Sequence, residues 1–374
     1  MSKILIWETL SEIGGGQQVT LRVADILQEN NELHFVIPQQ GELSAQLEKR
    51  GVSYTLMGDQ SMPKGRKGFL GLLKFLYLTL VAVIKGRRVV NKINPDIIYA
   101  PGPAALVWSA MCAKRSTKVV WHLHHVFESG VTLKLINIFS ARKCVKRIIS
   151  VSEYVSQQIT NEKAQSKKVT IYNSVEELSP EVERKNLCDE FPLLDKELRI
   201  AQIGFITKTK KQHKTLSIVN ELVKRGESVC LAIIGSVRQA DVEYKNQLDK
   251  TIEENNLMHN VVFTGYRTDV QQIMSTFDVV VLPSVEGFPL VAIQALSECV
   301  PVLTVDNSGC AEIVKNTGCG MIYSKDSDIG VIADTLLKCA MIDVKSAIEK
   351  HPDFLKSGCS KSSFVKSINN AFSL

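Results

Sequence analysis

The chemistry of this chain is concentrated in a loop between two buried segments. Residues 277–306 predict a strand, a loop, a helix and a second strand, and the loop holds Glu286 followed by Gly287, Phe288 and Pro289. The backbone N–H groups at the start of a helix are unpaired and carry partial positive charge, which suits phosphate and sugar oxygens. A carboxylate beside them can accept hydrogen bonds from sugar hydroxyls. This combination predicts a nucleotide-sugar site.

A second candidate is the basic run ITKTKKQHK at residues 206–214, which contains Lys208, Lys210, Lys211 and Lys214. A run of lysines is usually a solvated surface. Here Gly204 ends a predicted strand shortly before the run, and this placement favours phosphate binding.

Two further candidates lie in the first half. Gly14, Gly15 and Gly16 stand between a predicted strand and a helix, and they allow the backbone to approach a donor phosphate or an acceptor closely. They do not form the GxGxxG pattern of dinucleotide-binding proteins.

The other candidate is the group His122, His124 and His125 at the end of a strand, where alternation places His122 and His124 on one face. A core or loop role is the ordinary alternative, and a metal site lacks a supporting acid or cysteine spacing. Glu128, a few residues on, could bind or deprotonate an acceptor hydroxyl.

Strands alternate with helices throughout both halves, which predicts an α/β fold with two doubly wound parallel sheets. We expect domains at 1–178 and 198–355, a polar linker at 179–197, and a C-terminal helix at 356–374 whose packing partner the sequence does not assign. Two halves of one architecture predict a cleft between them, with ligands at the carboxyl ends of the strands. The strands are expected at 4–7, 34–37, 97–100, 119–123, 147–151, 199–203, 229–234, 261–263, 279–282 and 300–305.

Composition narrows the function. A chain of 374 residues with 45% hydrophobic and 22% charged content is typical of a globular protein of two domains. A net charge of +6 does not indicate a nucleic-acid partner, and it fits anionic substrates or an anionic membrane surface. Nine cysteines without a CxxC pair, and a start that leaves no room for a signal peptide, predict a cytoplasmic chain with reduced thiols.

One apolar segment, residues 69–84, has basic residues on both sides. It is shorter than the roughly 20 apolar residues of a spanning helix and contains Lys74, so spanning is the least favoured interpretation. The alternatives are a buried domain helix and an interfacial helix, with residues 64–88 in peripheral contact with the inner face of the cell membrane.

The order and spacing of several motifs resemble glycosyltransferase family 4 (group 1) of the GT-B glycosyltransferases. The similarity covers nearly the whole chain, through the segments GGGQQVTLRVADIL, VVWHLHH, ISVSEYV, VTIYNSVE, IGFITKTKKQHKTL and VVFTGYRTDVQQIMSTFDVVVLPSVEGFPLVAIQALSECVPVLTVDNSGCAEIV. The resemblance implies two facing Rossmann-like domains and a nucleotide-diphosphate sugar as co-substrate. It also implies no metal or other cofactor, and transfer with retention at the anomeric carbon.

The resemblance also assigns residues. It implies catalytic roles for Glu286, for Lys210 as the phosphate-binding lysine, and for His124 as a contact to the donor sugar. We expect Glu312 to support the site from the start of a helix. The expected substrate-binding residues are Gly15, Gly16, Gly204, Lys208, Gly287, Phe288, Pro289, Leu290, Gln294 and Glu312.

The chain departs from the family pattern at two positions. Phe205 stands where the family commonly has an arginine, so one diphosphate contact is missing or comes from a neighbouring lysine or from Arg267. Gln294 replaces the second acid of the Glu-x7-Glu motif that begins at Glu286, and a neutral acceptor forms weaker hydrogen bonds with ribose hydroxyls.

These observations favour a retaining glycosyltransferase that moves a hexose to a hydroxyl acceptor. The acceptor expected is a saccharide or lipid-linked saccharide in surface polysaccharide biosynthesis. Phe205 and Gln294 support an alternative, a non-catalytic nucleotide-sugar-binding homologue or partner subunit. A nicotinamide oxidoreductase is disfavoured because the glycine fingerprint and its ribose-binding acid are missing.

Overall fold

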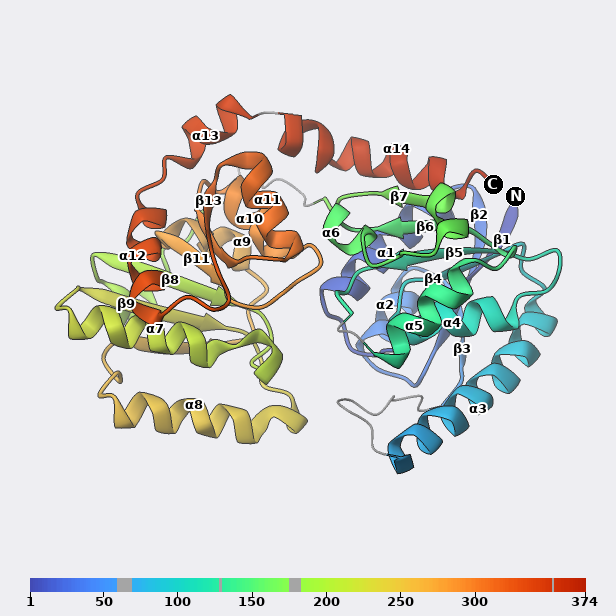
Figure 1. Ribbon diagram of the computed structural model, residues 1–374, viewed down its shortest axis with the longest axis horizontal. Coiled ribbons are helices and arrows are strands. Elements are labelled where there is room, and N and C mark those ends of the chain that lie inside the picture. The colour runs from blue at the N-terminus through green and yellow to red at the C-terminus, as the bar shows by residue number, and fades with distance from the viewer. Residues whose placement is uncertain (59–68, 128–129, 175–182, 352) are drawn as a thin grey trace. The chain divides into compact units, whose positions relative to one another are not determined.

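The chain forms two compact units, each built around one parallel sheet (Figure 1). The computed structural model describes residues 1–58, 69–127, 130–174, 183–351 and 353–374. Unit 1 comprises residues 1–173 and 362–374, and unit 2 comprises residues 174–361. The predicted α/β class with two Rossmann-like, doubly wound parallel sheets is confirmed.

Unit 1 contains a seven-stranded sheet in the order β3-β2-β1-β4-β5-β6-β7. Its central strands are buried along most of their length, as expected when helices cover both faces of a parallel sheet. The strands are β1 (Ser2–Trp7), β2 (Asn31–Ile37), β3 (Ser53–Leu56), β4 (Ile97–Ala100), β5 (Lys118–Leu123), β6 (Val145–Ser150) and β7 (Lys168–Thr170). The helices between them are α1 (Gly15–Gln28), α2 (Glu42–Lys49), α3 (Phe69–Ile93), α4 (Pro103–Cys112), α5 (Val131–Ser140) and α6 (Glu153–Ser156), with the 3-10 helix η1 (Glu162–Lys167).

Unit 2 contains a six-stranded sheet in the order β10-β9-β8-β11-β12-β13. One core lies between this sheet and the helices α7 (Gln212–Lys224), α8 (Val242–Glu254) and α12 (Ile329–Ala340). The strands are β8 (Leu198–Ile203), β9 (Val229–Ile234), β10 (Val261–Gly265), β11 (Val279–Leu282), β12 (Val302–Val305) and β13 (Gly320–Tyr323). The helices are α7 (Gln212–Lys224), α8 (Val242–Glu254), α9 (Val270–Ile273), α10 (Leu290–Ser297), α11 (Gly309–Thr317), α12 (Ile329–Ala340) and α13 (Val344–Lys350). Short helical turns are η2 (Leu187–Asp189), η3 (Pro192–Leu194), η4 (Lys208–Lys210), η5 (Gln239–Asp241), η6 (Met274–Thr276) and η7 (Phe354–Gly358).

Each sheet has a point at which the strand order reverses. In unit 2 the chain builds outward from β8 through β9 to β10, and then returns to place β11 on the other side of β8. The loops that follow β8 and β11 therefore leave the sheet in opposite directions, and open α/β sheets bind ligands at this point. This topology therefore predicts that a ligand site in unit 2 lies at the carboxyl ends of β8 and β11.

Unit 1 ends at Asn173 and unit 2 begins at Ser174, a few residues before the predicted linker at 179–197. Residues 175–182 lie outside the described part of the chain, while Leu187 and Leu194 in the following turns are buried. The backbone N–H of Leu187 donates to Thr276 Oγ1 at 3.0 Å. The described part of the predicted linker, residues 183–197, thus belongs to unit 2.

The C-terminal helix α14 (Lys361–Phe372), whose packing partner could not be predicted, contributes to unit 1. Its Phe364, Ile368 and Phe372 are buried, and the Phe372 ring meets Tyr99 of β4 edge-on at 5.4 Å between centroids. The chain therefore returns to its first unit after completing the second.

Candidate active site

The two residues expected to bind the donor meet at the reversal point of unit 2. Lys210 Nζ lies 2.7 Å from Glu286 Oε2, although the residues come from the separate loops after β8 and β11. The other carboxylate oxygen, Oε1, accepts a hydrogen bond from Ser284 Oγ at 2.8 Å. Both side chains remain partly exposed, at 31% for Lys210 and 16% for Glu286. The site therefore presents one cation and one anion that are held in place and accessible.

The backbone around Lys210 is tightly constrained. Gly204 has φ of +137°, which side chains rarely adopt, and a Cβ there would lie 3.8 Å from Lys210 Nζ. Gln202 Nε2 donates to the carbonyl oxygen of Lys210 at 2.7 Å, and Lys211 takes the left-handed conformation with φ of 55° before α7 begins. These contacts direct the ammonium group of Lys210 towards the loop of Glu286.

The loop after β11 is held by α11, the helix that follows the neighbouring strand β12. Gly309, the first residue of α11, donates its backbone N–H to the carbonyl oxygen of Glu286 at 2.7 Å. Gly287, Phe288 and Pro289 are buried, and Pro289 is the N-cap of α10. The backbone that leads from Glu286 into the helix is therefore held by a hydrogen bond and by burial.

The remaining predicted residues of unit 2 occupy the two helices and the lysine turn. Leu290 begins α10, and Gln294 lies one turn further, partly exposed. Glu312 lies in the first turn of α11, whose N-cap Ser308 accepts from the N–H of Ala311 at 3.1 Å. An acid in the first turn stabilises a helix, and the support that Glu312 is expected to give to the site stays a prediction.

The other lysines of the run have different surroundings. Lys208 lies in η4 and is exposed. Lys214 lies 4.9 Å from the centroid of the Tyr323 ring and donates to the carbonyl oxygen of Lys325 at 3.2 Å. Burial, followed by repulsion from Lys211, lowers the pKa of Lys214. Lys210 is thus the member of the run that pairs with Glu286.

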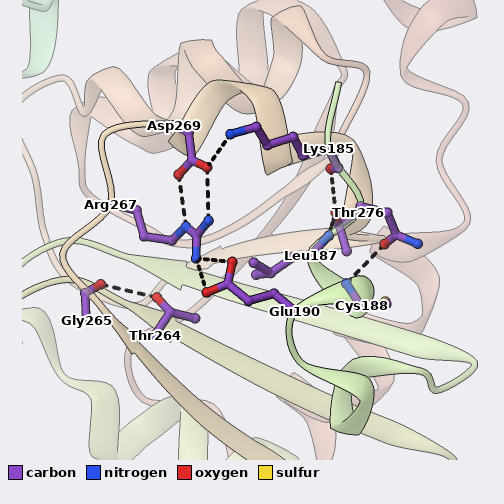
Figure 2. A network of polar contacts seen from close by, with 10 residues as sticks. Lys185, Leu187, Cys188, Glu190, Thr264, Gly265, Arg267, Asp269 and Thr276 are labelled. Carbon is purple, nitrogen blue, oxygen red and sulfur yellow. Dashed lines mark hydrogen bonds and ion pairs between the residues drawn. The ribbon is translucent and has the colours of Figure 1, made fainter. Parts of the chain in front are cut away.

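Arg267, one of the residues that could replace the diphosphate contact missing at Phe205, pairs with two acids of its own unit. Its guanidinium donates to Asp269 at 2.9 Å and to Glu190 at 2.8 Å, and its side chain is 14% exposed. Figure 2 shows Arg267 joined to both carboxylates by dashed lines. The hydrogen bonds from Arg267, ahead of other influences, lower the pKa of Asp269 to about 2. Lys185 adds a contact to Asp269 at 3.4 Å. This network fastens residues 185–190 to unit 2.

The predicted residues of unit 1 lie in two places. Gly15 and Gly16 begin α1, where Gly14 is the N-cap and its N–H donates to Gln17 Oε1 at 3.2 Å. A Cβ at either glycine would meet no described atom within 4 Å. Packing within the described residues therefore does not require glycine at either position, and close approach of a ligand stays a prediction.

The histidines lie on one face, as predicted. The rings of His122 and His124 are 4.0 Å apart, and the buried His122 shares a hydrogen bond of 2.7 Å between its Nδ1 and the hydroxyl of Tyr99. Burial lowers the pKa of His122 to about 3, and burial together with the neighbouring His122 and His125 lowers the pKa of His124. His124, directly after β5, is therefore a neutral imidazole near pH 7.

Sequence reasoning missed Ser284, Gln202 and the buried acid Glu8. Glu8 accepts from Thr20 Oγ1 at 2.7 Å, and its pKa is raised by burial. Glu128 lies outside the described residues. Across the ranges that are described, no three His, Cys, Asp or Glu side chains are arranged to hold a metal ion.

Two family models match the chain in succession. "Glycosyltransferase Family 4" matches residues 13–177, and "Glycosyl transferases group 1" matches residues 183–340. The site at Lys210 and Glu286 falls within the second match.

Several curated proteins are similar in sequence. The capsular polysaccharide biosynthesis glycosyltransferase CapM of Staphylococcus aureus is 28% identical over 207 residues, which is 52% of this chain and about half (52%) of that protein. The UDP-Gal:alpha-D-GlcNAc-diphosphoundecaprenol alpha-1,3-galactosyltransferase of Escherichia coli is 22% identical over 371 residues, covering 93% of this chain and 90% of that one.

Among solved structures, Anabaena HepE in complex with UDP-glucose aligns over 100% of both chains with a TM-score of 0.79 and 19% identity. This similarity shows a shared fold.

Proposed function

Because the chain belongs to the group 1, family 4 glycosyltransferases of the GT-B fold, we propose that it transfers a hexose from a nucleotide-diphosphate sugar to a hydroxyl acceptor. The observation that carries the proposal is the contact of 2.7 Å between Lys210 and Glu286 at the reversal point of the unit 2 sheet. It supports the proposal because the lysine expected to bind phosphate lies beside a carboxylate that can accept hydrogen bonds from sugar hydroxyls.

Uridine diphosphate sugars are the first donors to test. HepE was crystallised with UDP-glucose, and the relative from E. coli is named for UDP-Gal. The acceptor we propose is a lipid-linked saccharide of a surface polysaccharide, since CapM is named for capsular polysaccharide biosynthesis and the E. coli relative for a diphosphoundecaprenol-linked acceptor.

The proposed transfer proceeds with retention, at the front face of the sugar. The bond between the anomeric carbon and the β-phosphate oxygen breaks as the acceptor oxygen bonds to the same face, and the acceptor proton passes to the leaving phosphate. Lys210 and the N–H groups at the start of α10 stabilise the charge that develops on the diphosphate, so the reaction needs no metal. Glu286 fixes the sugar, and His124 is assigned a contact to the donor.

A peripheral membrane contact is proposed for α3. Its side chains at 77, 80 and 84 follow helical spacing, and Tyr77, Leu80 and Ile84 are 66%, 58% and 46% exposed. Arg88, one turn after Ile84, is exposed on the same face. Such a helix suits the surface of an anionic bilayer, whereas no helix within the described residues is long and apolar enough to cross one. Residues 64–68, part of the predicted contact at 64–88, lie outside the described residues.

Flotation with liposomes tests this contact. We expect the protein to float with vesicles that contain an anionic lipid at low salt, and a Tyr77→Ser, Leu80→Ser variant to remain in the dense fraction. Equal flotation of both proteins would show that this face of α3 is not the contact.

The decisive experiment for the function is transfer by the purified protein. UDP-glucose, UDP-galactose and their N-acetylated forms are offered with a short-chain lipid-linked saccharide, and the anomeric configuration of the product is read by NMR. A product of retained configuration supports the proposal. Donor binding without transfer to any acceptor would favour the alternative, a non-catalytic binder, for which Gln294 and Phe205 are the supporting observations.

A further inference from the structure

We infer that Arg238 is a second cation of the donor site and binds the diphosphate together with Lys210. The inference rests on the proposed function, because it names a further residue of the same site. Arg238 lies after β9, just before η5, and sequence reasoning gave it no role.

The backbone places Arg238 beside the loop of Lys210. The strands β8 and β9 are neighbours, and their pairing continues past the sheet in an isolated bridge between Ile206 and Val237. The two loops touch so closely that a Cβ at Gly235, which has φ of +151°, would lie 2.1 Å from the carbonyl oxygen of Gly204. Residues 204–206 and 235–238 therefore form one surface at the carboxyl ends of these strands.

Phe205 fixes the position of the arginine on that surface. The guanidinium carbon of Arg238 lies 4.0 Å from the centroid of the Phe205 ring. The backbone of Phe205 is itself held, since its carbonyl oxygen accepts a hydrogen bond from Gln212 Nε2 at 3.0 Å. A guanidinium contacts an aromatic ring through its face and binds phosphate oxygens through the N–H groups in its plane, so the two kinds of contact are compatible.

The charges around Gly204 agree with this role. Lys210 lies against Gly204, and Arg238 lies against the next residue, so the two cations flank one short stretch of backbone. Arg267, the other arginine considered for the diphosphate, is held by Asp269 and Glu190. Phe205 therefore serves as the support for an arginine that comes from the adjacent loop.

The test compares nucleoside diphosphates with the matching nucleosides. The dissociation constants of UDP, GDP, ADP and their nucleosides are measured by calorimetry for the wild type, Arg238→Gln and Phe205→Leu. Arg225→Gln is the control, because it also removes one positive charge from unit 2 but lies at the end of α7, where Arg225 pairs with Glu221 and Asp334.

We expect Arg238→Gln to weaken binding of the preferred diphosphate about ten-fold or more, as for a lost charged hydrogen bond, and to leave nucleoside binding unchanged. Phe205→Leu should show part of this loss, and little further loss when it is combined with Arg238→Gln. The control should bind like the wild type.

Each contrary result has a separate meaning. A diphosphate affinity within two-fold of the wild type for Arg238→Gln, or an equal loss for nucleoside and diphosphate, would overturn the role of Arg238 alone. Failure of the wild type to bind any of the three diphosphates would overturn the donor site of the proposed function together with this inference.

Discussion

Glu286 is the residue on which the proposed chemistry depends most directly. Both of its carboxylate oxygens have partners, Lys210 and Ser284, and its backbone carbonyl is held by Gly309. A side chain held in this way can meet a sugar hydroxyl without first being ordered, which is the benefit of a preorganised site.

We expect Glu286→Gln to lower kcat about 100-fold or more, because the amide keeps the shape of the side chain but loses its charge. The melting temperature should stay close to that of the wild type, since the group is partly exposed. Glu221→Gln, which removes an acid from the surface of α7, is the control for the change in charge. Full activity in the Glu286 variant would remove this residue from the reaction.

Gln294 gives a prediction of gained affinity. If its neutral amide stands where the family uses an acid for the ribose hydroxyls, Gln294→Glu should tighten binding of a nucleoside diphosphate by about two- to ten-fold. Calorimetry with UDP and with 2′,3′-dideoxy-UDP measures this gain, which should be absent for the dideoxy compound. Weaker binding of UDP in the variant would show that the ribose lies elsewhere.

Site residues could be predicted from the sequence where a short local motif marks them, and not where their partners are distant in sequence. Lys210 and Glu286 could be identified because each lies in a motif at the end of a buried strand. The ion pair between Arg267 and Glu190 could not be predicted, because Glu190 is 77 residues away in sequence and lies beside Arg267 only in the folded unit. Arg238 was missed for a similar reason, since its partner Phe205 belongs to another strand's loop.

At the scale of elements, the strands inside the sheets were predicted, and so was the edge strand β10, but the other three edge strands were not. The central strands are continuous apolar runs, such as Val229–Ile234, in which every residue is buried. The edge strands β3, β7 and β13 were missed because they are short and only partly buried, so they lack that pattern.

The contact between the loops after β8 and β9 gives an element-scale prediction. Gly235→Ala should destabilise the protein by about 2–4 kcal/mol, because the new Cβ meets the backbone of Gly204 and the residue has φ of +151°. Chemical denaturation measures the change. Gly226→Ala is the matched control, since Gly226 also has positive φ, +85°, but its Cβ would meet no described atom within 4 Å. Equal losses in the two variants would mean that backbone conformation, and not the loop contact, sets the cost.

At the scale of the whole molecule, buried histidines make stability depend on pH. Burial lowers the pKa of His122 to about 3, whereas an unfolded histidine titrates near 6.5. Between these values the unfolded chain binds the proton and the folded chain does not, so stability falls as the pH falls from 6.5 towards 3. The loss attributable to His122 at pH 5 is about 2 kcal/mol relative to pH 7.

We therefore expect His122→Gln to flatten the fall in unfolding free energy between pH 7 and pH 5, even if the variant is less stable at every pH. His259→Gln, at an exposed histidine, should keep the slope of the wild type. A slope unchanged by His122→Gln would assign the acid sensitivity to other groups, of which His124 is the first candidate.

The return of α14 to unit 1 has a consequence for biosynthesis. Tyr99 and its neighbours emerge from the ribosome early, yet the aromatic ring that covers Tyr99 belongs to residue 372. The nascent first unit must wait, with an apolar surface uncovered, until translation has passed through all of unit 2. Ribosome-bound chains that end before residue 361 should consequently recruit chaperones more strongly than chains in which α14 has emerged.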